Sequence, residues 1–189
     1  MAYLILVRHG ESVWNKKGIW TGLTDISLSK EGLEESRQAA SQLRSKKIDI
    51  AYTSVLKRAK ETLDIIKKTL NIPNLPVVED KALNERDYGI YTGKNKWEIE
   101  KEYGEKKFFQ IRRGWDMPIP KGETLKDVYN RVVPYYQKEI LPKLKEGKNV
   151  LIVAHGNSMR ALIKYLKNIS DEDIGNVELK TGEIARFNL

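Results

Sequence analysis

The amino-acid sequence predicts an α/β fold, namely a three-layer sandwich in which a mostly parallel central sheet is covered by helices on both faces. Two observations lead to this fold class. Short unbroken runs of aliphatic residues, typical of strands that are buried on both faces, recur along the 189-residue chain. Segments with apolar residues at helical spacing separate these runs, as expected where helices connect parallel strands. Because no repeat or linker interrupts the pattern, one domain is expected over residues 1–189.

The first half of the chain contains three apolar runs that are predicted strands, at residues 3–8, 48–54 and 75–80. A long loop follows the first run and ends at Ser29. Ser29 and Gly32 are typical of a helix start, and this helix is expected to extend to about Ser45. A second helix is predicted over residues 56–70, and Pro73 prevents its continuation. The order strand, helix, strand, helix, strand indicates parallel pairing.

The second half of the chain continues this alternation. Its predicted elements are a long helix, a strand, a short helix and a terminal β-hairpin, at residues 124–145, 149–155, 157–167 and 177–189. Pro134 and Pro142 lie inside the long helical pattern, so a kink or an early end is expected there. The hairpin is expected to turn at Thr181 and Gly182.

Residues 84–122 show a less regular pattern. Helical composition extends over residues 95–113, but Gly104 and Gly114 interrupt it. Five aromatic residues of this stretch are expected to form the core of a small lobe: Trp97, Tyr103, Phe108, Phe109 and Trp115. The same aromatic residues would be the main support for a nucleic-acid-binding module, but no recognisable nucleic-acid motif accompanies them.

The composition is basic, and taken alone this charge surplus is more simply explained by a well-solvated basic surface than by a particular ligand. The formal net charge is +8, which suits an anionic ligand, a nucleic acid or an anionic membrane surface. The longest apolar runs are too short to span a bilayer, and no signal-peptide pattern is present. The absence of cysteine excludes disulfides, thiol catalysis and zinc-thiolate sites. We therefore expect a cytoplasmic protein with neither a nucleic-acid nor a membrane partner.

The chain contains only two histidines, and both occupy equivalent positions. His9 and His155 each follow an apolar strand directly and each precede a glycine. Ligands collect beyond the carboxyl ends of parallel strands, where both imidazoles would meet. Arg8 adjoins His9, and Arg58 follows the second strand; their charges favour a neutral imidazole, which is a nucleophile. One guanidinium group can also bind two phosphate oxygens at once through parallel hydrogen bonds. This combination predicts phosphoryl transfer through His9.

Phosphoryl transfer also requires a proton donor for the leaving oxygen. Glu85, in the segment ALNERDYG, could supply that proton if burial raised the pKa of its carboxyl group. An iron or zinc site built from His9, His155 and Glu85 is an alternative. Arg8 and Arg58 argue against it, because they place positive charge where a cation would bind. We therefore expect no metal.

Six segments extend the pattern over nearly the whole chain: LVRHGESVWN, TGLTDISLSKEG, AYTSVLKRA, LNERDYG, RRG and AHGNSMRAL. In this order they resemble the 2,3-bisphosphoglycerate-dependent phosphoglycerate mutases of the histidine phosphatase superfamily. The resemblance implies interconversion of 3-phosphoglycerate and 2-phosphoglycerate in glycolysis and gluconeogenesis, with 2,3-bisphosphoglycerate as the priming phosphoryl donor. His9 would be phosphorylated, Glu85 would act as general acid and base, and Arg8, Arg58 and His155 would surround the phosphoryl group.

The same resemblance implies that residues 84–122 form a lobe that binds the substrate. The protein could also form a homodimer. The implied substrate-binding residues are Ser12, Asn15, Thr21, Gly22, Tyr88, Lys96, Arg112, Arg113, Gly156 and Asn157. Longer members of the family carry a further segment after RRG and a mobile tail after the last strand; many carry histidine where this chain has Asp87. Without such a tail, less complete closure and more hydrolysis of the phosphohistidine are expected. The alternative is a broad-specificity phosphomonoesterase on the same fold, with water as the acceptor.

Overall fold

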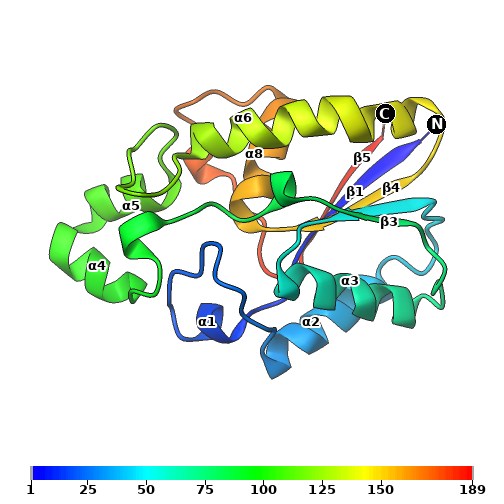
Figure 1. The fold of residues 1–189 in the computed structure, drawn as a ribbon, viewed down its shortest axis with the longest axis horizontal. Coiled ribbons are helices and arrows are strands. Elements are labelled where there is room, and N and C mark those ends of the chain that lie inside the picture. Colours follow the sequence, from blue (N-terminus) through cyan, green and yellow to red (C-terminus); the bar gives the residue numbers. More distant parts are fainter. Residues whose placement is uncertain (1, 189) are drawn as a thin grey trace.

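The computed structural model describes residues 2–188 and contains a five-stranded sheet with the strand order β3-β2-β4-β1-β5 (Figure 1). Neighbouring strands from β3 to β1 are parallel, whereas β5 runs antiparallel to β1. The strands are β1 (Tyr3–Arg8), β2 (Ile50–Thr53), β3 (Val77–Glu79), β4 (Val150–Ala154) and β5 (Ile184–Asn188). The predicted mostly parallel sheet is therefore confirmed.

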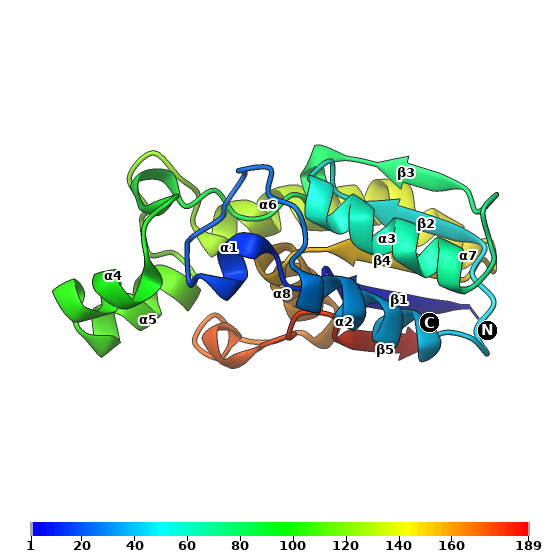
Figure 2. The same ribbon diagram turned by 90° about the horizontal axis from the view of Figure 1, so that it is seen from below.

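Helices cover both faces of this sheet, which explains why its central strands are apolar without alternation (Figure 2). Leu4 and Leu6 of β1 pack on the side of α6 and α8, while Ile5 and Val7 pack on the side of α2 and α3. No helix among residues 2–188 is long and apolar enough to cross a bilayer. The helices are α1 (Val13–Lys16), α2 (Lys30–Ser41), α3 (Lys57–Thr69), α4 (Lys96–Tyr103), α5 (Glu105–Arg113), α6 (Leu125–Tyr135), α7 (Leu141–Lys145) and α8 (Gly156–Lys167).

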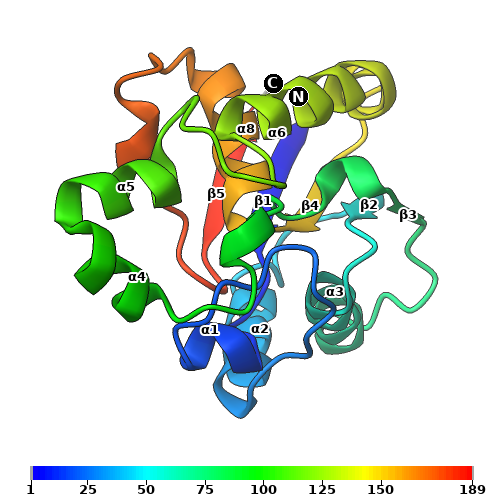
Figure 3. The same ribbon diagram turned by 60° about the vertical axis from the view of Figure 1, so that its left-hand side comes forward.

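Helices α4 and α5 lie beyond the end of the sheet, with a hydrophobic cluster of their own (Figure 3). The expected aromatic core of this region is largely wrong. Phe108 is buried, but Trp97 is 59% exposed and Phe109 is 43% exposed, while Trp115 packs against the main core. The reason is helical spacing: Phe108 and Ile111 share one face of α5, and the residue after Phe108 turns outward. The cluster comprises Trp20, Tyr91, Ile99, Phe108, Ile111 and Ile119.

The long helix predicted over residues 124–145 continues past both prolines. Thr124 begins it with a capping box, and α6 passes through Pro134 into a π-helical turn at Tyr136–Ile140. Helix α7 then follows with Pro142 near its start. The regular α-helix thus ends one residue after Pro134, as one of the two expected outcomes, but a π-helical turn carries the helical path on to α7.

The predicted C-terminal hairpin is also wrong. Strand β5 pairs with β1, and the segment before the turn forms no strand. Gly182, at φ +69°, turns the chain toward β1 and donates its N–H to the Arg8 carbonyl at 3.1 Å. The carbonyls of Val177 and Leu179 accept hydrogen bonds from arginine side chains instead of a strand partner. Leu189, the expected end of the hairpin, lies outside the described residues.

Candidate active site

A pocket lies beyond the carboxyl ends of β1 and β4 and receives side chains from both ends of the chain. All but two of the predicted site residues line it; the exceptions are Ser12 and His155. The lining residues are Arg8, His9, Asn15, Thr21, Gly22, Arg58, Glu85, Tyr88, Lys96, Arg112, Arg113, Gly156, Asn157, Arg160 and Glu178. The strand ends bring together residues that are far apart in sequence, as expected for a parallel sheet.

His9 is held in one orientation directly after β1. The side chain is buried, and its Nδ1 donates a hydrogen bond to the Gly10 carbonyl at 2.6 Å. This bond leaves the lone pair on Nε2, which accepts a hydrogen bond from the Arg58 Nε at 3.3 Å. Nε2 is therefore the ring nitrogen that carries the lone pair.

Glycine is required after His9 because helix α2 begins against this point of the chain. A Cβ on Gly10 would collide with the carbonyl oxygen of Gly32, and a Cβ on Gly32 would collide with the backbone of Glu11. Ser29 caps α2 by accepting the N–H of Gly32 at 3.0 Å. The glycines of the RHG and SKEG segments thus let the start of α2 pack beside the His9 loop.

The electrostatic environment keeps both imidazoles neutral. Burial, followed by the charges of Arg58 and Arg8, holds the pKa of His9 well below its usual value. Burial and Arg58 lower the pKa of His155 in the same way. The two rings lie side by side with their centroids 4.9 Å apart. A neutral His9 confirms the protonation state that the adjacent arginines predicted.

Arg58 connects His9 to the loop that follows α1. It lies in the first turn of α3 and is almost completely buried, and its guanidinium donates to the carbonyls of Gly22 at 2.8 Å and Thr24 at 3.0 Å. Burial lowers its pKa to about 10, so the group keeps its charge at neutral pH. Arg58 is therefore a fixed cation beside Nε2 of His9.

Glu85 is buried in the loop before Tyr88, and its carboxylate is ionised in this site. Its Oε1 accepts the N–H groups of Arg86 at 2.8 Å and Asn157 at 3.1 Å. Burial would raise the pKa of Glu85, but these N–H groups together with Arg58 and Arg8 lower it overall. The condition under which Glu85 could donate a proton, a pKa raised by burial, is therefore not met by these protein groups alone. A bound phosphate would offset the arginine charges and move this pKa upward.

Residues 4–189 match the family model described as histidine phosphatase superfamily (branch 1). This chain belongs to the histidine phosphatase superfamily. The 2,3-bisphosphoglycerate-dependent phosphoglycerate mutase of Cytophaga hutchinsonii is 48% identical over 96% of this chain and 85% of its own length. The protein of the same name from Nitrobacter hamburgensis is 46% identical over 98% of this chain and 91% of its own length. The solved structure of Bacillus stearothermophilus YhfR has a TM-score of 0.87 at 25% identity, covering 100% of this chain and 92% of that chain. The family resemblance is confirmed.

The histidine phosphatase pocket also contains two residues that the sequence reasoning missed. Arg160 is buried on α8 and donates to the amide oxygen of Asn157 at 2.6 Å, and Asn157 in turn donates to the Tyr88 hydroxyl at 2.7 Å. Arg160 lies one helical turn after Asn157, so helical spacing could have identified it. Glu178, in an irregular segment, gives no such signal.

The two predicted residues outside the pocket lie directly behind lining residues. Ser12 is fully buried and donates from its backbone N–H and its hydroxyl to the amide oxygen of Asn15, at 3.1 Å and 2.9 Å. This arrangement leaves the amide nitrogen of Asn15 for a ligand. His155 forms a 2.6 Å hydrogen bond between its Nε2 and the Ser54 hydroxyl. Ser12 thus orients Asn15, which lines the pocket, whereas the hydrogen bond of His155 goes to Ser54, which does not line it.

The remote side of the pocket supplies a second group of cations from α4 and α5. Lys96 opens α4, and Arg112 and Arg113 close α5. Burial, Arg112 and Arg8 lower the pKa of Lys96 to about 8. Arg113 forms an ion pair with Glu178 at 2.7 Å. Within residues 2–188, no three His, Cys, Asp or Glu side chains gather in a way that could hold a metal ion.

The buried neutral histidines make the folded protein sensitive to acid. Because the folded-state pKa values of His9 and His155 lie well below 6.5, the unfolded chain binds two more protons as pH falls below 6.5. The free energy of unfolding should fall by up to about 1.4 kcal/mol per pH unit for each imidazole. Urea unfolding between pH 7.5 and 5 measures this slope. His9→Asn should remove about half of the contribution that the two imidazoles make to this slope. An unchanged slope would contradict the conclusion that His9 is neutral in the folded protein.

Proposed function

We propose that this protein is a 2,3-bisphosphoglycerate-dependent phosphoglycerate mutase, which interconverts 3-phosphoglycerate and 2-phosphoglycerate in glycolysis and gluconeogenesis through a phosphohistidine at His9. The observation that carries the proposal is the presence of two separate groups of cations in one pocket. Arg8 and Arg58 adjoin His9, whereas Lys96, Arg112 and Arg113 come from the lobe of residues 84–122.

A phosphoglycerate carries two anionic groups, and the pocket matches both. The transferring phosphoryl group needs the cations beside His9, because charge neutralisation is a main source of catalysis in phosphoryl transfer. Lys96 and Arg112 are then available for the carboxylate and for a second phosphate, whereas Arg113 already pairs with Glu178. Six cationic side chains and two carboxylates line the pocket, so a substrate with several negative charges is favoured. A simple monoester would leave Lys96 and Arg112 without an anionic group of the substrate to bind.

The chemistry follows from the positions of His9 and Glu85. On the primed protein, the Glu85 carboxylate accepts the proton of the free hydroxyl of 3-phosphoglycerate, the hydroxyl oxygen attacks the phosphohistidine, and the bond between phosphorus and Nε2 of His9 breaks, which gives 2,3-bisphosphoglycerate. Nε2 of His9 then attacks the phosphorus atom of the other phosphate, the bond from that phosphorus to the substrate oxygen breaks, and that oxygen takes the proton back from Glu85. No hydrogen bond within the described residues reaches Oε2 of Glu85, so this oxygen is the one that exchanges the proton.

The residues present also fit 2,3-bisphosphoglycerate. When bound, it supplies the phosphoryl group that primes His9. Arg8 lines the pocket, and its Nε is buried with no hydrogen-bond partner among residues 2–188. A buried N–H without a partner is costly, and a phosphate oxygen would satisfy it. Arg8 and Arg58 would hold one phosphate, and the lobe cations would hold the other.

A broad-specificity histidine phosphatase on the same catalytic centre remains the second candidate. It would use the same phosphohistidine and differ only in the acceptor, which would be water. The lobe cations favour the mutase, and so does the 46–48% sequence identity to proteins named as mutases.

The compartment and the oligomeric state also belong to the proposal. The absence of cysteine agrees with a reducing compartment such as the cytoplasm. The homodimer stays a prediction.

An assay of 3-phosphoglycerate conversion in the presence of EDTA tests the proposal. Conversion to 2-phosphoglycerate should depend on trace 2,3-bisphosphoglycerate, should be unaffected by the chelator and should exceed the release of inorganic phosphate. The physical reason is that side-chain cations replace a metal as the source of positive charge. Release of phosphate from many monoesters without isomerisation would favour the phosphatase. Activity that EDTA removes and one metal restores would overturn the metal-free mechanism.

A further inference from the structure

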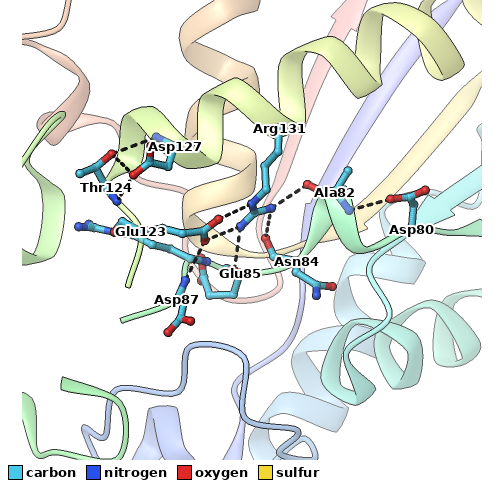
Figure 4. Close-up of polar contacts among 10 residues, drawn as sticks. Asp80, Ala82, Asn84, Glu85, Asp87, Glu123, Thr124, Asp127 and Arg131 are labelled. Carbon is cyan, nitrogen blue, oxygen red and sulfur yellow. Dashed lines mark hydrogen bonds and ion pairs between the residues drawn. The ribbon is translucent and has the colours of Figure 1, made fainter. Parts of the chain in front are cut away.

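Arg131 of α6 donates three hydrogen bonds to the segment that carries Glu85 (Figure 4). Its Nη1 donates to the carbonyls of Ala82 at 2.8 Å and Asn84 at 3.0 Å, and its Nη2 donates to the carbonyl of Glu85 at 3.0 Å. Nε and Nη2 also bind the two carboxylate oxygens of Glu123 at 2.8 Å and 2.9 Å. All five N–H groups are therefore engaged.

Glu123 holds the same segment from its other side. One oxygen of its carboxylate accepts the N–H of Asp87 at 3.0 Å, and its own carbonyl accepts Nε of Arg86 at 2.6 Å. Residues 84–88 contain no helix or strand that could fix their backbone. The ion pair between Glu123, just before α6, and Arg131, within α6, thus helps to hold this segment in place.

Arg131 does not line the pocket that contains His9. It borders a separate groove with Leu23 and Asn84, and its side chain is 24% exposed. A direct contact with substrate is therefore not its role. The planar guanidinium can bond a carboxylate and several carbonyls at once, which the single ammonium of lysine cannot reproduce.

We propose that Arg131 is a positioning residue for proton transfer: it fixes the backbone at residues 82–85 so that the Glu85 carboxylate meets the leaving oxygen of the substrate. The inference rests on the proposed role of Glu85. General acid catalysis requires the donor within about 2.6–3.2 Å of the oxygen that receives the proton. The three carbonyl contacts of Arg131 set the backbone from which that carboxylate extends.

The test compares two phosphoryl donors in single-turnover transfer to His9. Transfer from 2,3-bisphosphoglycerate releases an alkoxide oxygen that needs a proton, whereas p-nitrophenyl phosphate releases a stable phenolate that needs none. Arg131→Lys should slow transfer from 2,3-bisphosphoglycerate about 10- to 100-fold, because small displacements of a catalytic group have effects of this order. The rate of the nitrophenolate burst of Arg131→Lys should stay close to the rate measured with the unchanged protein. Rapid quenching with intact-mass measurement follows the first donor, and absorbance follows the second.

Three variants make the result decisive. Arg37→Lys, at an exposed ion pair with Glu34, is the matched control and should change neither rate. Glu85→Gln is the reference: if it slows both donors equally, its role as proton donor fails and the proposed mechanism must change. If Glu85→Gln is selective but Arg131→Lys slows both donors equally or neither, only the inference about Arg131 fails. If Arg131→Lys does not fold, Glu123→Gln takes its place, because this change weakens the same ion pair. The ratio of the transfer rates from the two donors is then compared in the same way.

Discussion

His9→Ala is expected to abolish turnover of phosphoglycerates while the protein stays folded and continues to bind them. In the proposed mechanism the imidazole forms the covalent bond to phosphorus, so the energy of binding elsewhere in the pocket cannot replace it. The cations that bind substrate, Arg58 and Lys96 among them, are anchored by other elements and should keep their positions. Intact-mass measurement after incubation with 2,3-bisphosphoglycerate should show one added phosphoryl group on the unchanged protein and none on the variant.

The control for this experiment separates loss of the nucleophile from loss of the fold. Near-ultraviolet circular dichroism and calorimetric binding of 3-phosphoglycerate should both resemble those of the unchanged protein. Gly10 loses a hydrogen-bond partner in the variant, so a modest decrease in stability is expected. Uptake of the label by His9→Ala would identify another nucleophile.

Glu85→Gln is expected to lower kcat about 100- to 10,000-fold, the range that general acid-base catalysis typically contributes. Glutamine preserves the shape of the side chain, and its amide oxygen can still accept the N–H groups of Arg86 and Asn157. It cannot transfer the proton, so KM should change far less than kcat. Steady-state kinetics with 3-phosphoglycerate measure both constants.

The matched control is Glu34→Gln, an exposed carboxylate on α2 that should leave both constants unchanged. The pH profile gives a second readout. In the unliganded protein the pKa of Glu85 is lowered, so the carboxylate form persists below its ordinary range. A kcat near that of the unchanged protein would remove Glu85 from the mechanism.

The strand ends are the part of the site that sequence alone predicts well. Apolar runs identify β1 and β4, and the carboxyl ends of parallel strands must meet at one edge of the sheet. The proximity of His9 to His155 and the neutral state of His9 follow from that rule and from the adjacent arginines.

Other features depend on contacts that no local pattern records. The pKa direction of Glu85 follows in part from the N–H of Asn157, which lies 72 positions later in the chain. The path of residues 177–180 is set by side chains of Arg8 and Arg160 that take carbonyls a hairpin would have used. Arg131 gives little sequence signal, because three of its hydrogen bonds go to backbone carbonyls, which every residue possesses, and its partner Glu123 lies eight positions earlier, outside helical spacing.

The strand order has a consequence for synthesis of the protein on the ribosome. Strand β1 emerges first, yet both of its partners, β4 and β5, come from residues 150–188. Its four buried apolar residues must wait until β4 and β5 have been synthesised before they can pair. Pairing over such sequence separations is slow, and unpaired apolar strands favour association between nascent chains. The arrangement that places β1 between β4 and β5 therefore delays formation of the surroundings of His9 until both of these strands are available.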